Sequence, residues 1–136
     1  MAKKLIYIND LYVGYGTSAE VSAEPNTEST ATFDGPVTYG EDNVPHTVKI
    51  ERLRYGKIAD YKQLAILLHD MLATPYPITI KEDVKMVDGK VRVTDRVYNC
   101  LLSNDNYKLD PEAGTVESLE FSGGKRSRWI GGEKIY

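Results

Sequence analysis

The sequence is poor in the residues that carry most protein chemistry. Its 136 residues include one cysteine, Cys100, and two histidines, His46 and His69. A single cysteine excludes an intrachain disulfide, and with it a secreted disulfide scaffold. These three side chains lie far apart in the sequence and show no metal-ligand spacing, so we expect no metal site and no cofactor. Cys100 lies in an apolar segment, which predicts a buried structural thiol.

Catalytic motifs and long hydrophobic runs are also missing. Gly123-Gly124 and Gly131-Gly132 lack the strand-to-helix context of a phosphate-binding loop. No nucleophile can be paired with a general base, so we expect a protein that is not an enzyme. No apolar stretch approaches transmembrane length, and the apolar run at positions 5–8 is too short for a signal peptide. The sequence therefore predicts function through shape and assembly.

Basic residues are absent from positions 9–45, which hold seven acidic residues. Positions 123–136 instead hold four basic residues and one acidic residue. Complementary charge steers association, so we expect the two regions to meet on neighbouring copies, although both could equally be solvated segments without a partner. The candidate inter-subunit residues are Glu24, Glu28, Asp34, Glu41, Asp42, Lys125, Arg126 and Arg128.

One segment has a helical period. Apolar residues recur at three- and four-residue spacing between Tyr61 and Thr74. Asp60 and Gln63 match a capping box, and Pro75 ends the helix. The sequence predicts a single helix that packs on a sheet. The apolar face consists of Leu64, Leu68, Met71 and Leu72.

The clearest hairpin follows the helix. Asp88-Gly89 forms a favoured two-residue turn between two alternating segments. The apolar residues of the second segment, from Val91 to Leu101, fall on one face, and polar residues fall on the other. We expect the polar face to be wet. It consists of Lys81, Asp83, Lys85, Arg92, Thr94 and Arg96.

The pattern as a whole predicts a mainly β fold with one α-helix. Alternating segments rich in Val, Ile, Thr and Tyr indicate about seven strands. We expect one domain over residues 1–136, with two packed antiparallel sheets that form a barrel-like sandwich flanked by the helix. Residues 34–45 lack a hydrophobic period and predict a long assembly loop. Residues 123–136 form a basic C-terminal segment.

The order of these segments resembles that of bacteriophage tail tube proteins. The early strands end in Ala23-Glu24-Pro25-Asn26-Thr27-Glu28, and a long loop around positions 31–36 follows. Next come a strand, the helix at positions 60–72 and the hairpin. The last parts are Asn99-Cys100-Leu101-Leu102 and the strand at positions 115–123. The resemblance is one of layout over nearly the whole chain.

The resemblance implies a structural subunit that assembles into stacked, hexameric rings around a conduit for DNA. Tubes of type VI secretion systems share this architecture. It also implies a virion tail assembled in the host cytoplasm, with sheath, tape-measure or baseplate proteins as partners and no membrane contact. DNA would pass without sequence-specific binding, and the polar hairpin face (Lys81 to Arg96) would be the candidate lumen lining. A net charge of −3 is compatible with a lumen that does not attract phosphate.

Two alternatives account for the same features. A tail terminator or baseplate ring protein of similar fold would form one ring and stop. A monomeric β-barrel binding module would use the Tyr-rich strand faces, because tyrosine combines apolar area with a polar tip. Electron microscopy separates the three, since they give hollow filaments, discrete rings and small particles respectively.

Overall fold

In the residues that the structure describes, the chain forms twelve strands and one helix. The structure is a computed structural model. It describes residues 3–16, 18–23, 31–32, 35–36, 45–55, 58–103, 106–110 and 112–136. The strands are β1 (Lys4–Ile8), β2 (Leu11–Gly16), β3 (Ala19–Ala23), β4 (Ala31–Thr32), β5 (Gly35–Pro36), β6 (His46–Arg54), β7 (Tyr76–Met86), β8 (Gly89–Leu102), β9 (Lys108–Asp110), β10 (Thr115–Gly123), β11 (Arg126–Ile130) and β12 (Glu133–Lys134). Helix α1 (Ile58–Asp70) lies between β6 and β7.

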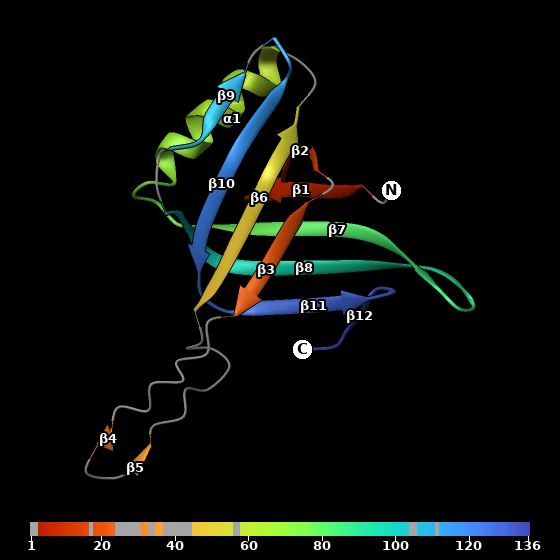
Figure 1. The fold of residues 1–136 in the computed structure, drawn as a ribbon. Helices are drawn as coiled ribbons and strands as arrows, with labels where there is room; N and C mark the ends of the chain where they lie inside the picture. The colour runs from red at the N-terminus through yellow and green to blue at the C-terminus, as the bar shows by residue number, and fades with distance from the viewer. Residues whose placement is uncertain are drawn as a thin grey trace.

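Strands β1, β2, β6, β10, β8 and β7 close into a barrel (Figure 1). Closure depends on a short pairing of β10 with β8, in which Phe121 is opposite Leu102. All strand pairs are antiparallel. Outside the barrel, β3 pairs with β6, β9 with β10, and β11 with β8 and β12. The predicted mainly β, barrel-like fold with one helix is confirmed.

A single apolar core joins the barrel to the helix. Its largest fully buried side chains include Phe121, Ile6 and Ile50 from the strands. Helix α1 contributes Leu64 and Leu68, both fully buried, and Leu67, which is almost so, and Met71 in the turn directly after the helix is fully buried as well. The predicted helix face is therefore confirmed at three of its four positions. The prediction for Leu72 is wrong, because this residue lies beyond the end of α1 in the following turn and is 45% exposed.

The helix begins earlier than the sequence predicts. It starts at Ile58, so Asp60 lies inside its first turn and does not occupy the N-cap position of the predicted capping box. It ends at Asp70, five residues before Pro75, and the backbone N–H of Thr74 donates to the carbonyl of Asp70 over 2.8 Å. The turn after the helix thus forms before the proline is reached.

Tight turns join β1 to β2 and β7 to β8. Asn9 and Asp10 both have positive φ, 51° and 64°, which suits a two-residue turn between β1 and β2. In the β7–β8 hairpin, Met86 pairs with Gly89, so the connecting residues are Val87 and Asp88. The predicted Asp88-Gly89 turn is therefore displaced by one residue. Gly89 has a φ of 138° at the first paired position, which explains the need for glycine there.

The alternation of inward and outward side chains along β8 changes near the end of the strand. Asn99 has a φ of 57°, and the pairing with β7 shifts register between Ile78 and Tyr76. Beyond this irregularity Cys100 and Leu102 point into the core, whereas Leu101 is exposed. The predicted placement of Leu101 on the same face as Val97 is thus wrong, because one irregular residue moves the later side chains to opposite faces.

Part of the early chain lies outside the description. Of the predicted loop at 34–45, the structure describes only β5 and Pro45. The five acidic candidates for inter-subunit contact also lie outside the described residues: Glu24, Glu28, Asp34, Glu41 and Asp42. Among the described residues, no helix has the length and apolar character needed to cross a membrane.

Candidate assembly surface

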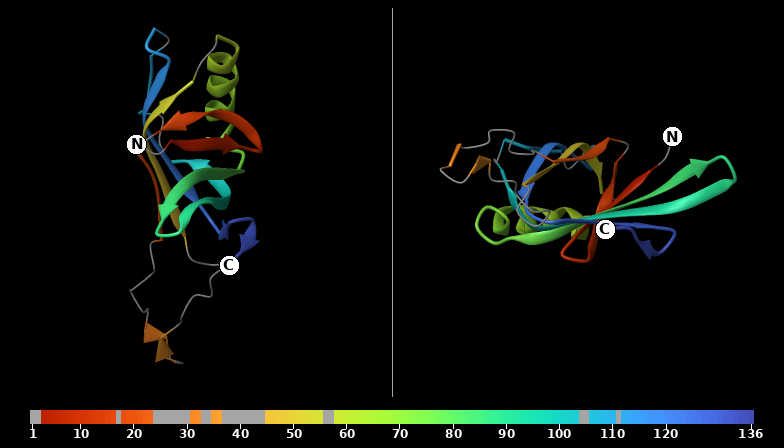
Figure 2. Two further views of the ribbon diagram at one scale, coloured as in Figure 1. Left: turned by 90° about the vertical axis from the view of Figure 1, so that its right-hand side faces the viewer. Right: turned by 90° about the horizontal axis from the view of Figure 1, so that it is seen from below.

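A sheet made of β1, β7, β8 and β11 extends beyond the barrel (Figure 2). Strands β7 and β8, with 11 and 14 residues, are the longest in the chain's described part, and their outer halves project as a hairpin. Directly opposed residues in antiparallel strands have side chains on the same face of a sheet. The strand register therefore decides which residues share each face of this hairpin sheet.

The register places all six candidate lumen-facing residues on one face, which we call the polar face. Asp83 is opposite Arg92, and Lys81 is opposite Thr94. Thr79 is opposite Arg96, and Lys85 is opposite a further lysine, Lys90. Strand β1 adds Leu5 and Tyr7, and β11 adds Trp129. That this face lines a lumen remains a prediction.

Two ion pairs order the polar face. Arg92 Nε donates to Asp83 Oδ1 over 2.6 Å, and this hydrogen bond holds the pKa of the Asp83 carboxyl below its usual range. Arg96 Nη1 donates to Asp10 Oδ1 over 2.7 Å and to Thr79 Oγ1 over 3.2 Å. The second pair fastens the β1–β2 turn to β8 across β7. Both guanidinium groups are therefore engaged within the chain.

A basic hollow of about 580 Å³ lies on the outer part of the polar face. We define the basic hollow by its lining side chains: Lys3, Leu5, Lys81, Asp83, Lys85, Lys90 and Arg92. Five of these are basic and one is a carboxylate. A second hollow of about 310 Å³ lies beside it, and Lys81 lines both. The sign of charge here is opposite to that of the whole chain.

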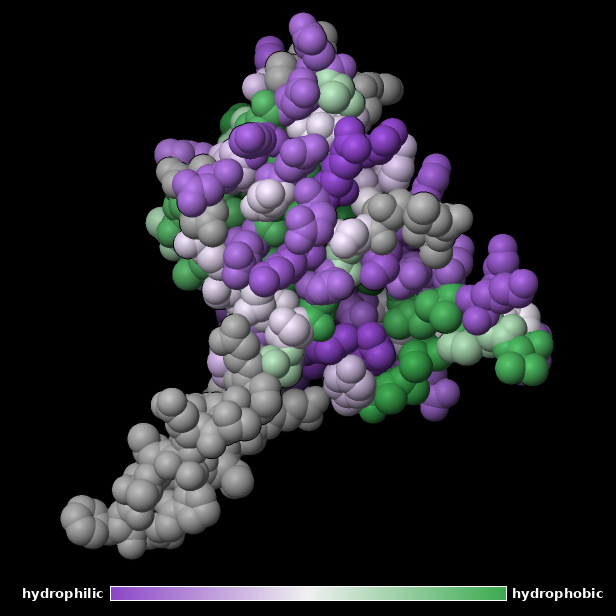
Figure 3. Space-filling view, viewed as in Figure 1, coloured by the Kyte–Doolittle hydropathy of each residue, from purple (hydrophilic) through white to green (hydrophobic). Residues whose placement is uncertain are grey.

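The opposite face of the hairpin sheet, which we call the inner face, changes character along its length. Near the barrel it forms part of the core, where Ile6 and Ile80 are opposed and buried. Charged residues, among them Glu82 and Asp95, follow on this face. At the outer end of the hairpin the face is apolar again and at least partly exposed, and Met86 is 42% exposed. This apolar patch gathers over the hairpin (Figure 3). The apolar patch consists of Val84, Met86, Val91, Val93 and Ile130.

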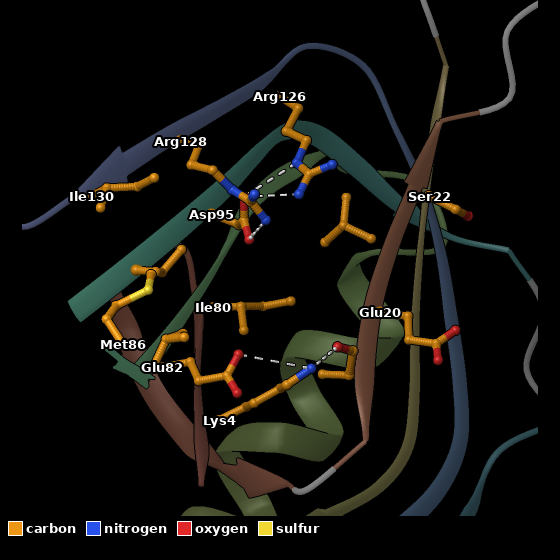
Figure 4. Close-up of a pocket in the computed structure, with 14 residues that line it drawn as sticks. Lys4, Glu20, Ser22, Ile80, Glu82, Met86, Asp95, Arg126, Arg128 and Ile130 are labelled. Atoms are coloured by element: carbon orange, nitrogen blue, oxygen red, sulfur yellow. Dashed lines mark hydrogen bonds and ion pairs between the residues drawn. The ribbon is translucent and has the colours of Figure 1, made fainter. Parts of the chain in front are cut away.

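A cleft of about 470 Å³ separates the inner face from β3, and a charged cluster lies in it (Figure 4). Asp95, whose side chain is 14% exposed, accepts hydrogen bonds from Arg126 and Arg128. The shortest joins Arg128 Nε to Asp95 Oδ1 over 2.8 Å. Lys4 Nζ donates to the Ala19 carbonyl over 2.8 Å. These contacts fasten β11 to β8 and β1 to β3.

Asp95 should make stability depend on pH. Burial raises the pKa of the Asp95 carboxyl, but Arg128 and Arg126 outweigh burial, and the pKa lies below the usual value of 3.8. A lowered folded pKa gives stability that is complete above the unfolded pKa and is lost as pH falls through the folded value. We expect Asp95→Asn to reduce the free energy of unfolding by about 1–3 kcal/mol at pH 7.

Urea unfolding from pH 7 to pH 2.5 tests this expectation. The difference between wild type and Asp95→Asn should stay constant down to about pH 4.5 and shrink below about pH 4. Asp88→Asn, in the exposed hairpin turn, is the matched control and should change stability by less than about 0.5 kcal/mol. A difference that persists unchanged to pH 2.5 would show that the ionised carboxylate is not the source.

The basic candidates for inter-subunit contact have roles inside the chain. Arg126 and Arg128 lie on the inner face and bind Asp95, so reversing their charge would disturb the fold as well as any interface. Lys125 is exposed directly before β11. Their predicted pairing with the acidic early chain remains a prediction. The sequence does contain one sign of this charged cluster. Asp95 is a carboxylate on the otherwise apolar face of the segment, between Val93 and Val97.

The residues with potential for chemistry have structural roles. Cys100 is fully buried, as predicted, and burial raises the pKa of its thiol to about 12. Its Sγ donates to the carbonyl of Val97. His46 Nδ1 lies 2.6 Å from the carbonyl oxygen of Gly124 and links β6 to the β10–β11 turn. In the part of the chain that is described, no cluster of His, Cys, Asp and Glu could hold a metal ion.

Comparison with known proteins identifies a likeness of fold. No family model matches the sequence, and no curated protein shows significant sequence similarity to it. Among solved structures, one described as the crystal structure of Hcp protein superimposes with a TM-score of 0.52. The alignment covers 94% of this chain and 90% of the Hcp chain, at 8% sequence identity. The whole described barrel, with its helix, therefore has an Hcp-like fold.

Proposed function

We propose that this chain is a structural subunit that assembles with copies of itself into a tube. The observation that carries the proposal is the two-faced projecting hairpin. Its inner face exposes the apolar patch, and its polar face exposes the basic hollow. A two-stranded ribbon is marginally stable alone, and contiguous exposed apolar surface marks an interaction site. A neighbouring copy would cover the apolar patch and leave the polar face toward the lumen.

The geometry of the barrel supports contact between unlike surfaces of neighbouring copies. The outer end of the β7–β8 hairpin lies away from the helix and from β9 (Figures 1 and 2), and this end carries Val84, Met86 and Val91 of the apolar patch. Strand β3 pairs with β6 along one edge, and no described strand pairs with its other edge. An unpaired strand edge is a ready template for pairing with another chain. Contacts between two different surfaces produce closed rings or open-ended filaments.

The Hcp-like fold and the resemblance to tail tube proteins favour stacked rings. We assign the chain to a phage tail tube, with hexameric rings around a conduit for DNA in a virion tail assembled in the host cytoplasm. Sheath, tape-measure or baseplate proteins would be its partners. The extended polar face, with Lys81, Thr94 and Arg96 near its centre, would line the conduit.

Sedimentation velocity over a hundredfold range of protein concentration, with negative-stain microscopy of the same samples, tests the proposal. We expect hollow filaments of uniform diameter at high concentration. Discrete rings that do not extend would assign the chain to a terminator or baseplate ring. A monomer at all concentrations, with no particles larger than the 15.3 kDa chain, would contradict the proposal.

A further inference from the structure

Charge on the polar face is arranged to attract an anion. Lys85 and Lys90 are directly opposed across the hairpin. Like charges in this position repel and destabilise a strand pair. Neither lysine forms an ion pair with any residue that the structure describes. Lys3 and Lys81 bring two further ammonium groups to the same hollow.

The cations of the basic hollow that form no ion pair with a described residue are ammonium groups, because the nearby guanidinium groups are occupied. Of these lysines, Lys3 lies over the Tyr15 ring at 4.7 Å. Arg92 binds Asp83 through two nitrogens, and Arg96 binds Asp10 and Thr79. Planar guanidinium groups recognise carboxylates through paired hydrogen bonds, and these are not available here. Ammonium groups act as mobile point charges, which suits contact with phosphate oxygens. The chemistry therefore favours phosphate over the carboxylates of an acidic polypeptide.

The neighbouring hollow extends this chemistry toward β11. Lys81 lies over the Tyr7 ring at 4.8 Å, and Lys134 lies over the Trp129 ring at 5.9 Å. Each of these two rings therefore already has a cation over one face, which leaves less aromatic surface on which unpaired bases could stack. A ligand along this face would meet mainly positive charge. This suits a duplex, whose phosphates are exposed and whose bases are already stacked on one another.

We propose that the basic hollow binds the phosphate backbone of duplex nucleic acid without sequence preference. The inference deepens the proposed function, because it names what the wall of the tube would contact. It departs from the expectation that the lumen does not attract phosphate. All lining residues belong to one chain, so the hollow is already formed in the single subunit.

Fluorescence anisotropy with a labelled 30-base-pair duplex of random sequence, at about 50 to 300 mM salt, tests the proposal. We expect binding at low salt, and the logarithm of the binding constant should fall linearly with the logarithm of the salt concentration. Lys85→Glu/Lys90→Glu should weaken binding at least about tenfold and reduce the salt slope by about two. Lys62→Glu/Lys108→Glu changes the net charge equally on exposed residues outside the polar face and should bind like wild type.

Inorganic polyphosphate and poly-glutamate are the comparison ligands. Duplex binding that exceeds poly-glutamate binding at equal charge concentration supports the inference. Equal or tighter poly-glutamate binding would overturn it in favour of an acidic polypeptide, and polyphosphate binding without duplex binding would overturn the nucleic-acid assignment. Equal loss in both double variants would overturn the assignment to the basic hollow, because it would show a general effect of net charge. Sedimentation of the same samples separates failure to bind from failure to assemble.

Discussion

Val84→Asp/Met86→Asp should abolish assembly while leaving the subunit folded. Both side chains belong to the apolar patch on the inner face of the projecting hairpin and are at least partly exposed in the single chain. Burying an apolar side chain of this size contributes about 1.5–3 kcal/mol, and burying an unpaired carboxylate costs several kcal/mol more. Because the contact recurs at every subunit, we expect the sedimenting fraction to fall at least about tenfold.

The same strand offers a matched control. Lys85 lies between the two positions, and its side chain points to the polar face. Lys85→Asp introduces the same residue one position away and should assemble like wild type. Circular dichroism should show that all variants retain the fold. Equal loss of assembly in Lys85→Asp and in the double variant would indicate that both faces are buried between copies, and the assignment of the polar face to the lumen would be wrong.

Leu68→Ala should produce a large loss of stability. Its side chain is fully buried in the core that joins α1 to the barrel. Truncating a buried leucine removes its transfer free energy and leaves a cavity, at a cost of about 2–5 kcal/mol. Urea unfolding of the non-assembling Val84→Asp/Met86→Asp background measures this value without a contribution from assembly.

Ile66 is the control on the same helix. It is 63% exposed, so Ile66→Ala should change the free energy of unfolding by less than about 0.5 kcal/mol. A cost below about 0.5 kcal/mol for Leu68→Ala would mean that the helix packs loosely on the barrel and does not support the fold.

Local patterns in the sequence predict much of the fold. The three- and four-residue spacing of Leu64 and Leu68 predicts the buried helix face, and strict alternation from Ile78 onward predicts the two faces of the hairpin. These patterns predict the structure correctly because each face of the helix or strand contacts either the core or the solvent along its length. They fail where a single residue changes the backbone, as at Asn99, whose positive φ moves Leu101 to the surface.

The candidate site is less predictable, because its contacts join segments far apart in the chain. The pairing of β7 with β8 places Lys90 opposite Lys85. The alternation of side chains along each strand does not show that Lys3, from the start of the chain, adds a further positive charge to the same hollow. The basic C-terminal segment has a clear composition, yet composition does not show that Arg126 and Arg128 share Asp95. Only the pairing of β11 with β8 brings these three side chains together.

Electron cryo-microscopy of the assembled protein, at a resolution that separates strands, would show directly which face of the hairpin lies in the channel. We predict a tube in which the apolar patch on the β7–β8 hairpin is buried against the next copy and Lys81, Lys85 and Arg92 face the channel. An assembly in which this hairpin lies on the outer surface, with the apolar patch in contact with solvent, would contradict this prediction.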